Sequence, residues 1–173
     1  PFSLVPAVVF APSPGLAPLM LWMNELVDVQ AVQVLVQAPQ DLFDLAGTMV
    51  QPGPAFMGAE APEVSVEGTD LVRLTVRLPV EMPAITGAEQ LGIQLSVLAG
   101  LAEGTTATVQ IQQLVLVSSA GAEEVLDGAG LGLLSTVTIG QGPPPPPPAF
   151  FLTPMQLFAT SPGAATLWLM MTD

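Results

Sequence analysis

Short stretches in which apolar and polar residues alternate recur along this chain, and they restrict its fold more than any other feature. In Val29–Gln37, the residues Val32, Val34 and Val36 fall on one face of an extended segment and the residues between them on the other. A period of two residues is typical of a half-buried β-strand, whereas an amphipathic helix repeats its apolar residues every three to four positions. We therefore expect a central strand here.

The same alternation predicts further strands. Leu71–Leu78 turns its aliphatic residues inward and places Arg73 and Arg77 on one exposed face. Leu91–Ala99 repeats the pattern with Ile93, Leu95 and Val97 inside. Ala107–Val117 follows it until the doublet Gln112-Gln113, where the pattern changes phase, as it does at a β-bulge.

Turn residues separate other apolar runs. Ser3–Phe10 and Ala17–Asn24 are predicted strands on either side of the Pro/Gly cluster Ala11–Gly15, and Leu134–Ile139 is the predicted last strand of the module. Gln40–Ala46 is the best candidate for a short helical turn.

We expect eight or nine strands in all, these seven among them, and no amphipathic helix long enough to cover a sheet. Strands at such spacings are typical of sandwiches. The expected fold class is all-β, a two-sheet antiparallel sandwich such as a jelly roll.

The charge of the chain excludes several partners. The chain has fifteen acidic residues and only two basic ones, Arg73 and Arg77, so its net charge is −13. No basic patch can neutralise nucleic-acid phosphates or anionic lipids, and no apolar stretch reaches the roughly 18 residues of a membrane span. We expect neither nucleic-acid binding nor membrane insertion.

Cysteine and histidine are absent, which removes disulfides, thiolate metal sites and the usual catalytic bases. Only carboxylate pairs, hydroxyl nucleophiles and oxygen-ligand metal sites remain. No cofactor is expected, and the chain is predicted not to be an enzyme.

The first and last stretches of the chain resemble each other. Pro1–Glu25 aligns without a gap with Ala149–Asp173 at a shift of 148 residues, and twelve of the 25 positions are identical. Self-similarity at a fixed period indicates an array, and this period is that of a whole domain. We infer a β-sandwich module over 1–140 and the beginning of a second copy over 149–173.

Residues 141–148 join these parts as a Gly/Pro-rich linker. Pro143–Pro148 are six consecutive prolines, which favour a stiff polyproline II rod about 19 Å long. An inert spacer and a ligand for proline-recognising domains are the two interpretations, and the first is preferred.

Acidic residues could bind a hard cation such as Ca²⁺, but no sequence pattern supports such a site. Asp41 and Asp44 lack the surrounding Asp-x-Asp-x-Asp-Gly loop and suit a helix start. Two predicted loops are interpreted as solvated acidic rims. The first carries Glu60, Glu63, Glu67 and Asp70, and the second carries Glu123, Glu124 and Asp127.

Other candidate motifs are weak. Trp22 and Trp168 lie in equivalent strands, where core or edge packing is favoured over sugar stacking. Gly128–Gly132 lacks the helix and lysine of a phosphate loop and is predicted to be a turn. Ser118 and Ser119 have no evident base.

The order of segments resembles the cohesin-like family of two-sheet jelly-roll sandwiches, found in cellulosome scaffolds and bacterial surface proteins. The resemblance rests on Pro14-Gly15, Val34–Leu42, Gly87–Val97, Glu103–Val109 and Ser135–Ile139, and it covers most of residues 1–140. The aromatic residues usual in these strands are largely aliphatic here, and Ala-Pro replaces an Asp-Pro. The resemblance implies the fold. It does not extend to dockerin binding, because no matching recognition residues are found.

The chain is accordingly predicted to be a structural module of a tandem-repeat extracellular or cell-surface filament protein. Copies of itself are the expected partners, either as further modules of a longer tandem chain or as neighbouring subunits joined head to tail by β-strand addition. The residues predicted to make this contact are Phe150, Leu152, Leu157, Phe158, Leu167, Trp168, Leu169 and Met171. The alternative is a carbohydrate- or protein-binding adhesion module of the cohesin type.

Overall fold

The computed structural model describes residues 2–143, 149–153 and 168–172. The chain divides into two compact units, Pro1–Gly142 and Pro143–Asp173. In chain order the elements are β1 (Phe2–Val5), β2 (Val8–Ala11), β3 (Gly15–Gln37), β4 (Phe43–Pro52), the 3₁₀ turn η1 (Pro54–Phe56), β5 (Glu63–Gly68), β6 (Leu71–Arg77), β7 (Ile85–Val97), β8 (Thr106–Ser118), β9 (Glu123–Asp127), β10 (Leu134–Ile139), β11 (Ala149–Thr153) and β12 (Trp168–Thr172).

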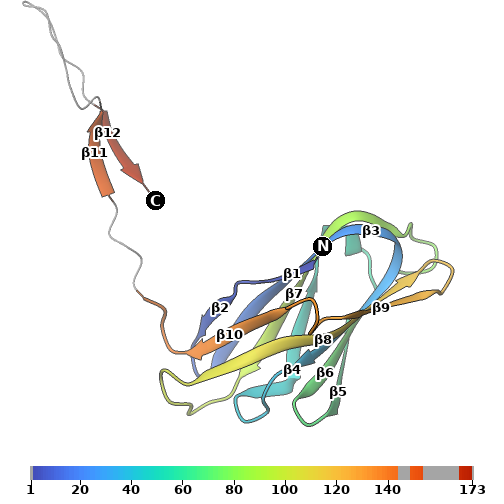
Figure 1. Ribbon diagram of the computed structural model, residues 1–173, viewed down its shortest axis with the longest axis horizontal. Helices are drawn as coiled ribbons and strands as arrows, with labels where there is room; N and C mark the ends of the chain where they lie inside the picture. The colour runs from blue at the N-terminus through green and yellow to red at the C-terminus, as the bar shows by residue number, and fades with distance from the viewer. Residues whose placement is uncertain (1, 144–148, 154–167, 173) are drawn as a thin grey trace, which may run out of the picture. The chain divides into compact units, whose positions relative to one another are not determined.

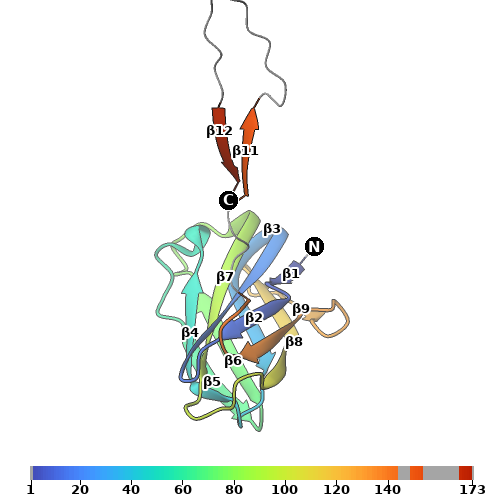
Figure 2. The same ribbon diagram turned by 90° about the vertical axis from the view of Figure 1, so that its left-hand side faces the viewer.

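The first unit is a β-sandwich (Figures 1 and 2). One layer consists of β1, the first half of β3, β7 and β4. The other consists of β2, β10, β8, the second half of β3, β6 and β5, with β9 beside the far end of β8. The predicted all-β sandwich is confirmed. Its described part has ten strands rather than eight or nine, because two acidic segments that were predicted as loops, β5 and β9, are strands, and so is the unpredicted segment β4.

Strand β3 belongs to both layers. Its first half pairs with β7 and its second half with β6 and β8, and two register shifts separate the halves. Glu25 and Asp28 have positive φ angles of 61° and 54° at this bend. The two strands predicted over Ala17–Asn24 and Val29–Gln37 are therefore one continuous strand, bent where irregular residues interrupt the alternation.

The strand predicted over Ser3–Phe10 is in fact two strands in different layers. Pro6 follows the last residue of β1 and cannot donate to a sheet ladder. The chain then crosses to the other layer, where β2 pairs in parallel with β10. Apart from this parallel pair, the strand pairs of the sandwich are antiparallel.

The core consists of the inward residues that alternation identified. Val32, Val34 and Val36 are buried, and so are the inward residues of β6 and β7. The predicted bulge in β8 is confirmed, because Leu35 lies opposite Gln113 whereas its neighbour Val36 lies opposite Ile111. Gln112 is the extra residue.

Three local predictions were wrong. The helical turn predicted over Gln40–Ala46 is limited to two hydrogen bonds that Pro39 accepts from the N–H groups of Leu42 and Phe43, and Phe43 already begins β4. The two acidic rims are in part strands, β5 and β9, which pair with β6 and β8. Exposed edge strands tolerate charged side chains, which hides their alternation.

The second unit contains the strand pair β11 and β12. Phe150 lies opposite Met171, and Leu152 lies opposite Leu169. In the first unit, β1 and β3 pair Phe2 with Met23 and Leu4 with Leu21. The two registers are identical after the shift of 148 residues, so both copies of the repeated sequence form the same strand pair.

Candidate interaction site

The outward side of β3 and β6 carries rows of polar and aliphatic side chains, which we call the polar face. Alternation places these residues there because their neighbours along each strand are buried. Leu35 lies opposite Arg73 and Gln33 lies opposite Thr75. The polar face consists of Gln33, Leu35, Gln37, Leu71, Arg73, Thr75 and Arg77.

Hydrogen bonds between side chains hold this face in place. The Nε of Arg73 donates to Glu67 Oε1 on β5 at 2.9 Å, and a second guanidinium nitrogen of Arg73 donates to Gln33 Oε1 at 3.5 Å. On the other side of β3, Gln112 Nε2 donates to Gln37 and to Gln110. The sequence predicted that both arginines share one exposed face, but the glutamine network was not predicted. Its trace in the sequence is the recurrence of glutamine at alternate outward positions of these strands.

The polar face is also where the positive charge of the chain lies. Arg73 and Arg77 are its two cations, and both belong to β6. Arg77 is exposed, whereas Arg73 shares its charge with Glu67 through an ion pair whose side chains are 30% and 36% exposed. An acidic group of a partner would find its complementary charge at this face.

Several acidic candidates stabilise turns. Asp70, with φ of 62°, accepts a hydrogen bond from the N–H of Gln40 at 2.7 Å, which ties the β5–β6 turn to the chain after β3. Asp127 Oδ1 accepts one from the N–H of Ala129 at 3.1 Å. Within the described ranges, no three acidic side chains come close enough together to hold a metal ion.

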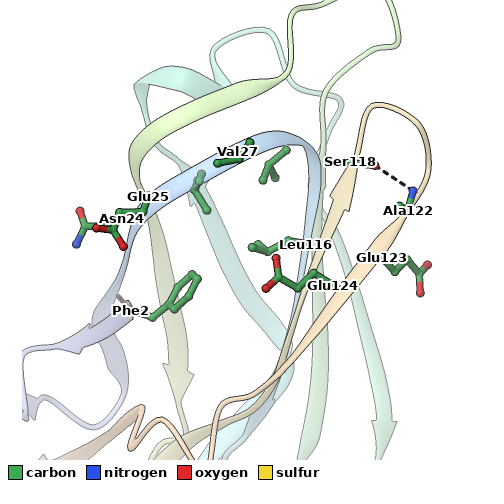
Figure 3. Close-up of a pocket in the computed structure, with 11 residues that line it drawn as sticks. Phe2, Asn24, Glu25, Val27, Leu116, Ser118, Ala122, Glu123 and Glu124 are labelled. Atoms are coloured by element: carbon green, nitrogen blue, oxygen red, sulfur yellow. Dashed lines mark hydrogen bonds between the residues drawn. The ribbon is translucent and has the colours of Figure 1, made fainter.

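A pocket of about 330 Å³ lies at the bend of β3, beside the β8–β9 hairpin (Figure 3). Its apolar lining includes Phe2, Leu26 and Leu116, and Glu123 and Glu124 lie at its rim. Figure 3 shows the ring of Phe2 and the side chain of Leu116 pointing into it. The hydroxyl-bearing Ser118 also lines the pocket.

The remaining motifs have structural roles. Ser118 Oγ accepts a hydrogen bond from the N–H of Ala122 at 3.0 Å, which closes the β8–β9 turn. Gly128–Gly132 forms the predicted turn, in which the N–H of Gly132 donates to the oxygen of Ala129. Among the described residues, no helix is long and apolar enough to cross a membrane.

Trp22 is not a core residue. It lies on the outward side of β3, opposite Gln90, and 41% of its surface is exposed. Among the predicted assembly residues, Phe150 and Leu152 lie in β11, and Trp168, Leu169 and Met171 lie in β12. The other three, Leu157, Phe158 and Leu167, lie outside the described residues.

Comparison with known proteins identifies the fold. No family model and no curated protein matches the sequence. Among solved structures, the chain is similar to a cohesin module of a family 33 glycoside hydrolase from Clostridium perfringens, with a TM-score of 0.57, 14% identity, and 80% of this chain and 94% of that chain covered.

Two further cohesins are similar. One is a non-cellulosomal cohesin from the hyperthermophilic archaeon Archaeoglobus fulgidus, with a TM-score of 0.54, 13% identity, and coverage of 81% and 91%. The other belongs to a type I cohesin–dockerin complex from Clostridium thermocellum, with a TM-score of 0.54, 11% identity, and coverage of 80% and 98%. The chain therefore has a cohesin-like β-sandwich fold.

Proposed function

We propose that this chain is a non-catalytic protein-binding module of an extracellular or cell-surface protein, and that its polar face receives the partner. The observation that carries the proposal is the outward side of β3 and β6, where both cations lie among half-buried aliphatic and amide side chains. A cohesin of the same fold has been solved in complex with a dockerin, which makes dockerin modules the first partners to test.

The test is a calorimetric titration of the full chain with the dockerin module of that complex. Replacing both cations, R73A/R77A, is expected to weaken binding about tenfold or more, since each charge-assisted hydrogen bond contributes about 1.5–3 kcal/mol. The control is Q94A/S96A, on the outward side of β7 in the other layer. No binding up to about 1 mM, or equal affinity for the R73A/R77A variant, would contradict the proposal.

A second candidate function is that of a repeated structural module, and a specific observation favours it. Six residues of the aligned segment are both buried in the first unit and identical in the second copy: Leu4, Ala11, Ala17, Leu19, Leu21 and Met23. The seventh buried position, Val9, is replaced by leucine. Conservation of inward residues together with the shared strand register supports a second sandwich that begins at Ala149.

Engineered disulfides test this candidate, since the chain has no cysteine of its own. In the double variant F150C/M171C the two residues lie directly opposite each other, so a disulfide is expected under mild oxidation. F2C/M23C is the equivalent pair of the first copy. L152C/M171C is the control, because diagonal neighbours lie too far apart. Equal cross-linking of the diagonal and direct pairs would contradict the shared register.

A further inference from the structure

Trp22 is an exposed aromatic residue in the layer of the sandwich that lies opposite the polar face. It lies on the outward side of β3, between Ser3 of β1 and Gln90 of β7, which pair with it from either side. Two positions beyond Gln90, the outward position of β7 is Gly92, which pairs with Gln51 of β4. We call Trp22, Gln90 and Gln51 the tryptophan patch.

The glycine between these residues shapes the patch. A β-carbon at Gly92 would lie 3.1 Å from Gln51 Cβ and 3.6 Å from Gln51 Oε1. The side chain of Gln51 therefore lies against the backbone of β7. Because Gly92 is a diagonal neighbour of Trp22 in the sheet, no side chain stands between the indole and the Gln51 amide at this position.

The two amides of the patch are available to a ligand. Neither the Gln90 nor the Gln51 side chain hydrogen-bonds to another described residue, whereas Gln112 in the other layer donates to Gln37 and Gln110. Each amide offers two N–H donors and one carbonyl acceptor. The β-carbons of directly opposite residues lie about 4.5–5.5 Å apart, so the Gln90 amide reaches a group that stacks on the indole.

These groups restrict the class of ligand. A purely apolar partner would cover the two amides without giving them hydrogen bonds, which is unfavourable. An anion is repelled by the net charge of −13, and a cation finds no carboxylate in Ser3 or Gln90, the direct neighbours of Trp22. An uncharged pyranose with equatorial hydroxyls fits, because it presents C–H groups to an aromatic ring and hydroxyls at its rim.

The second copy of the repeated sequence also has a tryptophan on this side of the equivalent strand. Met20 and Trp22 correspond to Trp168 and Met170 at the shift of 148 residues, so the two residue types exchange places. Residues two positions apart share one side of a strand. The sequence thus keeps an indole on this side but not at a fixed position, as expected for a ligand contact rather than for a packed core residue.

We propose that the tryptophan patch binds uncharged carbohydrate. A pyranose ring stacks on the indole of Trp22, and the amides of Gln90 and Gln51 exchange hydrogen bonds with its hydroxyls. The patch belongs to the layer opposite the polar face, so carbohydrate binding is independent of the proposed partner binding and each can fail without the other.

Fluorescence of the full-chain variant W168F tests the proposal. The chain has two tryptophans and no tyrosine, so the emission of this variant reports on Trp22. Hexasaccharides of β-linked glucose and of β-linked xylose are the probes. At least one should shift the emission to shorter wavelength with a dissociation constant of about 1 mM or less, whereas the charged hexasaccharide of galacturonic acid should not.

Calorimetry of further variants assigns the contacts. W22M in the W168F background introduces the residue that the second copy has at this position, Met170, and should weaken binding about tenfold or more. Q90A/Q51A should weaken it about threefold or more. V66T is the matched control, because Val66 of β5 is 43% exposed, close to the 41% of Trp22, and it should leave the affinity unchanged.

Circular dichroism and thermal unfolding verify that each variant is folded. The proposal is overturned if neither neutral probe binds up to about 10 mM, if W22M binds as tightly as its parent, if V66T weakens binding as much as W22M, or if the charged hexasaccharide binds more tightly than the neutral ones.

Discussion

Single residues in this sandwich matter most where the backbone comes close to another strand. Gly128 is buried at the end of the β9 strand, and a β-carbon there would lie 2.4 Å from the carbonyl oxygen of Ile111 and 2.8 Å from Ile111 Cγ2. Backbone atoms of a central strand cannot move aside. A β-carbon at Gly130, two residues later, would instead lie 2.7 Å from Asp127 Oδ2, the end of an exposed side chain rather than a backbone atom.

The two glycines therefore predict different outcomes. G128A should lower the free energy of unfolding by about 1–3 kcal/mol, because the added methyl group forces the β9–β10 turn away from β8. G130A is the control in the same turn and should change it by less than about 0.5 kcal/mol. Urea unfolding followed by circular dichroism measures both. Equal losses in the two variants would show that the close approach to Ile111 is not the cause.

At the scale of elements, the β-bulge in β8 decides which side chains enter the core. Ile111 and Leu114 are both buried, although three positions separate them, because Gln112 is an extra residue. Without Gln112 the chain would alternate regularly from Val109 to Leu116. Without Gln110, either Val109 or Ile111 would have to turn toward water.

Deleting one glutamine or the other tests this account. Removal of Gln112 keeps every inward residue in place. It removes the hydrogen bond that the Gln112 carbonyl accepts from Gly128 at 3.1 Å, about 1 kcal/mol, and the partly exposed side-chain hydrogen bonds to Gln37 and Gln110. Removal of Gln110 should cost about 1.5–3 kcal/mol more, the free energy of exposing a buried aliphatic side chain. The midpoints of urea unfolding give the order, and a more damaging loss of Gln112 would refute the bulge assignment.

At the scale of the whole molecule, like charge opposes the compact state. Fifteen carboxylates and two guanidinium groups belong to one chain, and their mutual repulsion is screened when the Debye length falls from about 30 Å at 0.01 M salt to about 8 Å at 0.15 M. Unfolding separates these charges, so repulsion favours the unfolded chain at low salt.

Raising NaCl from about 0.01 M to about 0.15 M should therefore raise the unfolding temperature by about 2–4 °C for each 1 kcal/mol of repulsion removed. Calorimetry at low protein concentration measures the shift. CaCl₂ and MgCl₂ at matched ionic strength serve as controls for the predicted lack of a calcium site. A larger shift with Ca²⁺ than with Mg²⁺ would indicate specific binding and contradict that prediction.

Alternation of residue types was sufficient to place most strands and their inward faces. Val34, Leu74 and Ile93 are buried as predicted, because alternate side chains of a half-buried strand face the core and water in turn. The similarity of the first and last stretches was also visible in the sequence, because twelve of the 25 aligned positions are identical. These identical positions include residues that face the core of the first unit. These properties depend on neighbours along the chain.

Only the tertiary structure decided how the strands are shared between the layers. The crossing at Pro6, the bend at Glu25 and Asp28, and the parallel pairing of β2 with β10 depend on contacts between distant segments. The apolar pocket lined by residues of β1, β2 and β3 is a consequence of these contacts, because it lies where the pairing of β1 with β3 ends. Local sequence determines which side of a strand avoids water, whereas long-range packing determines which strand covers it and where an edge stays open.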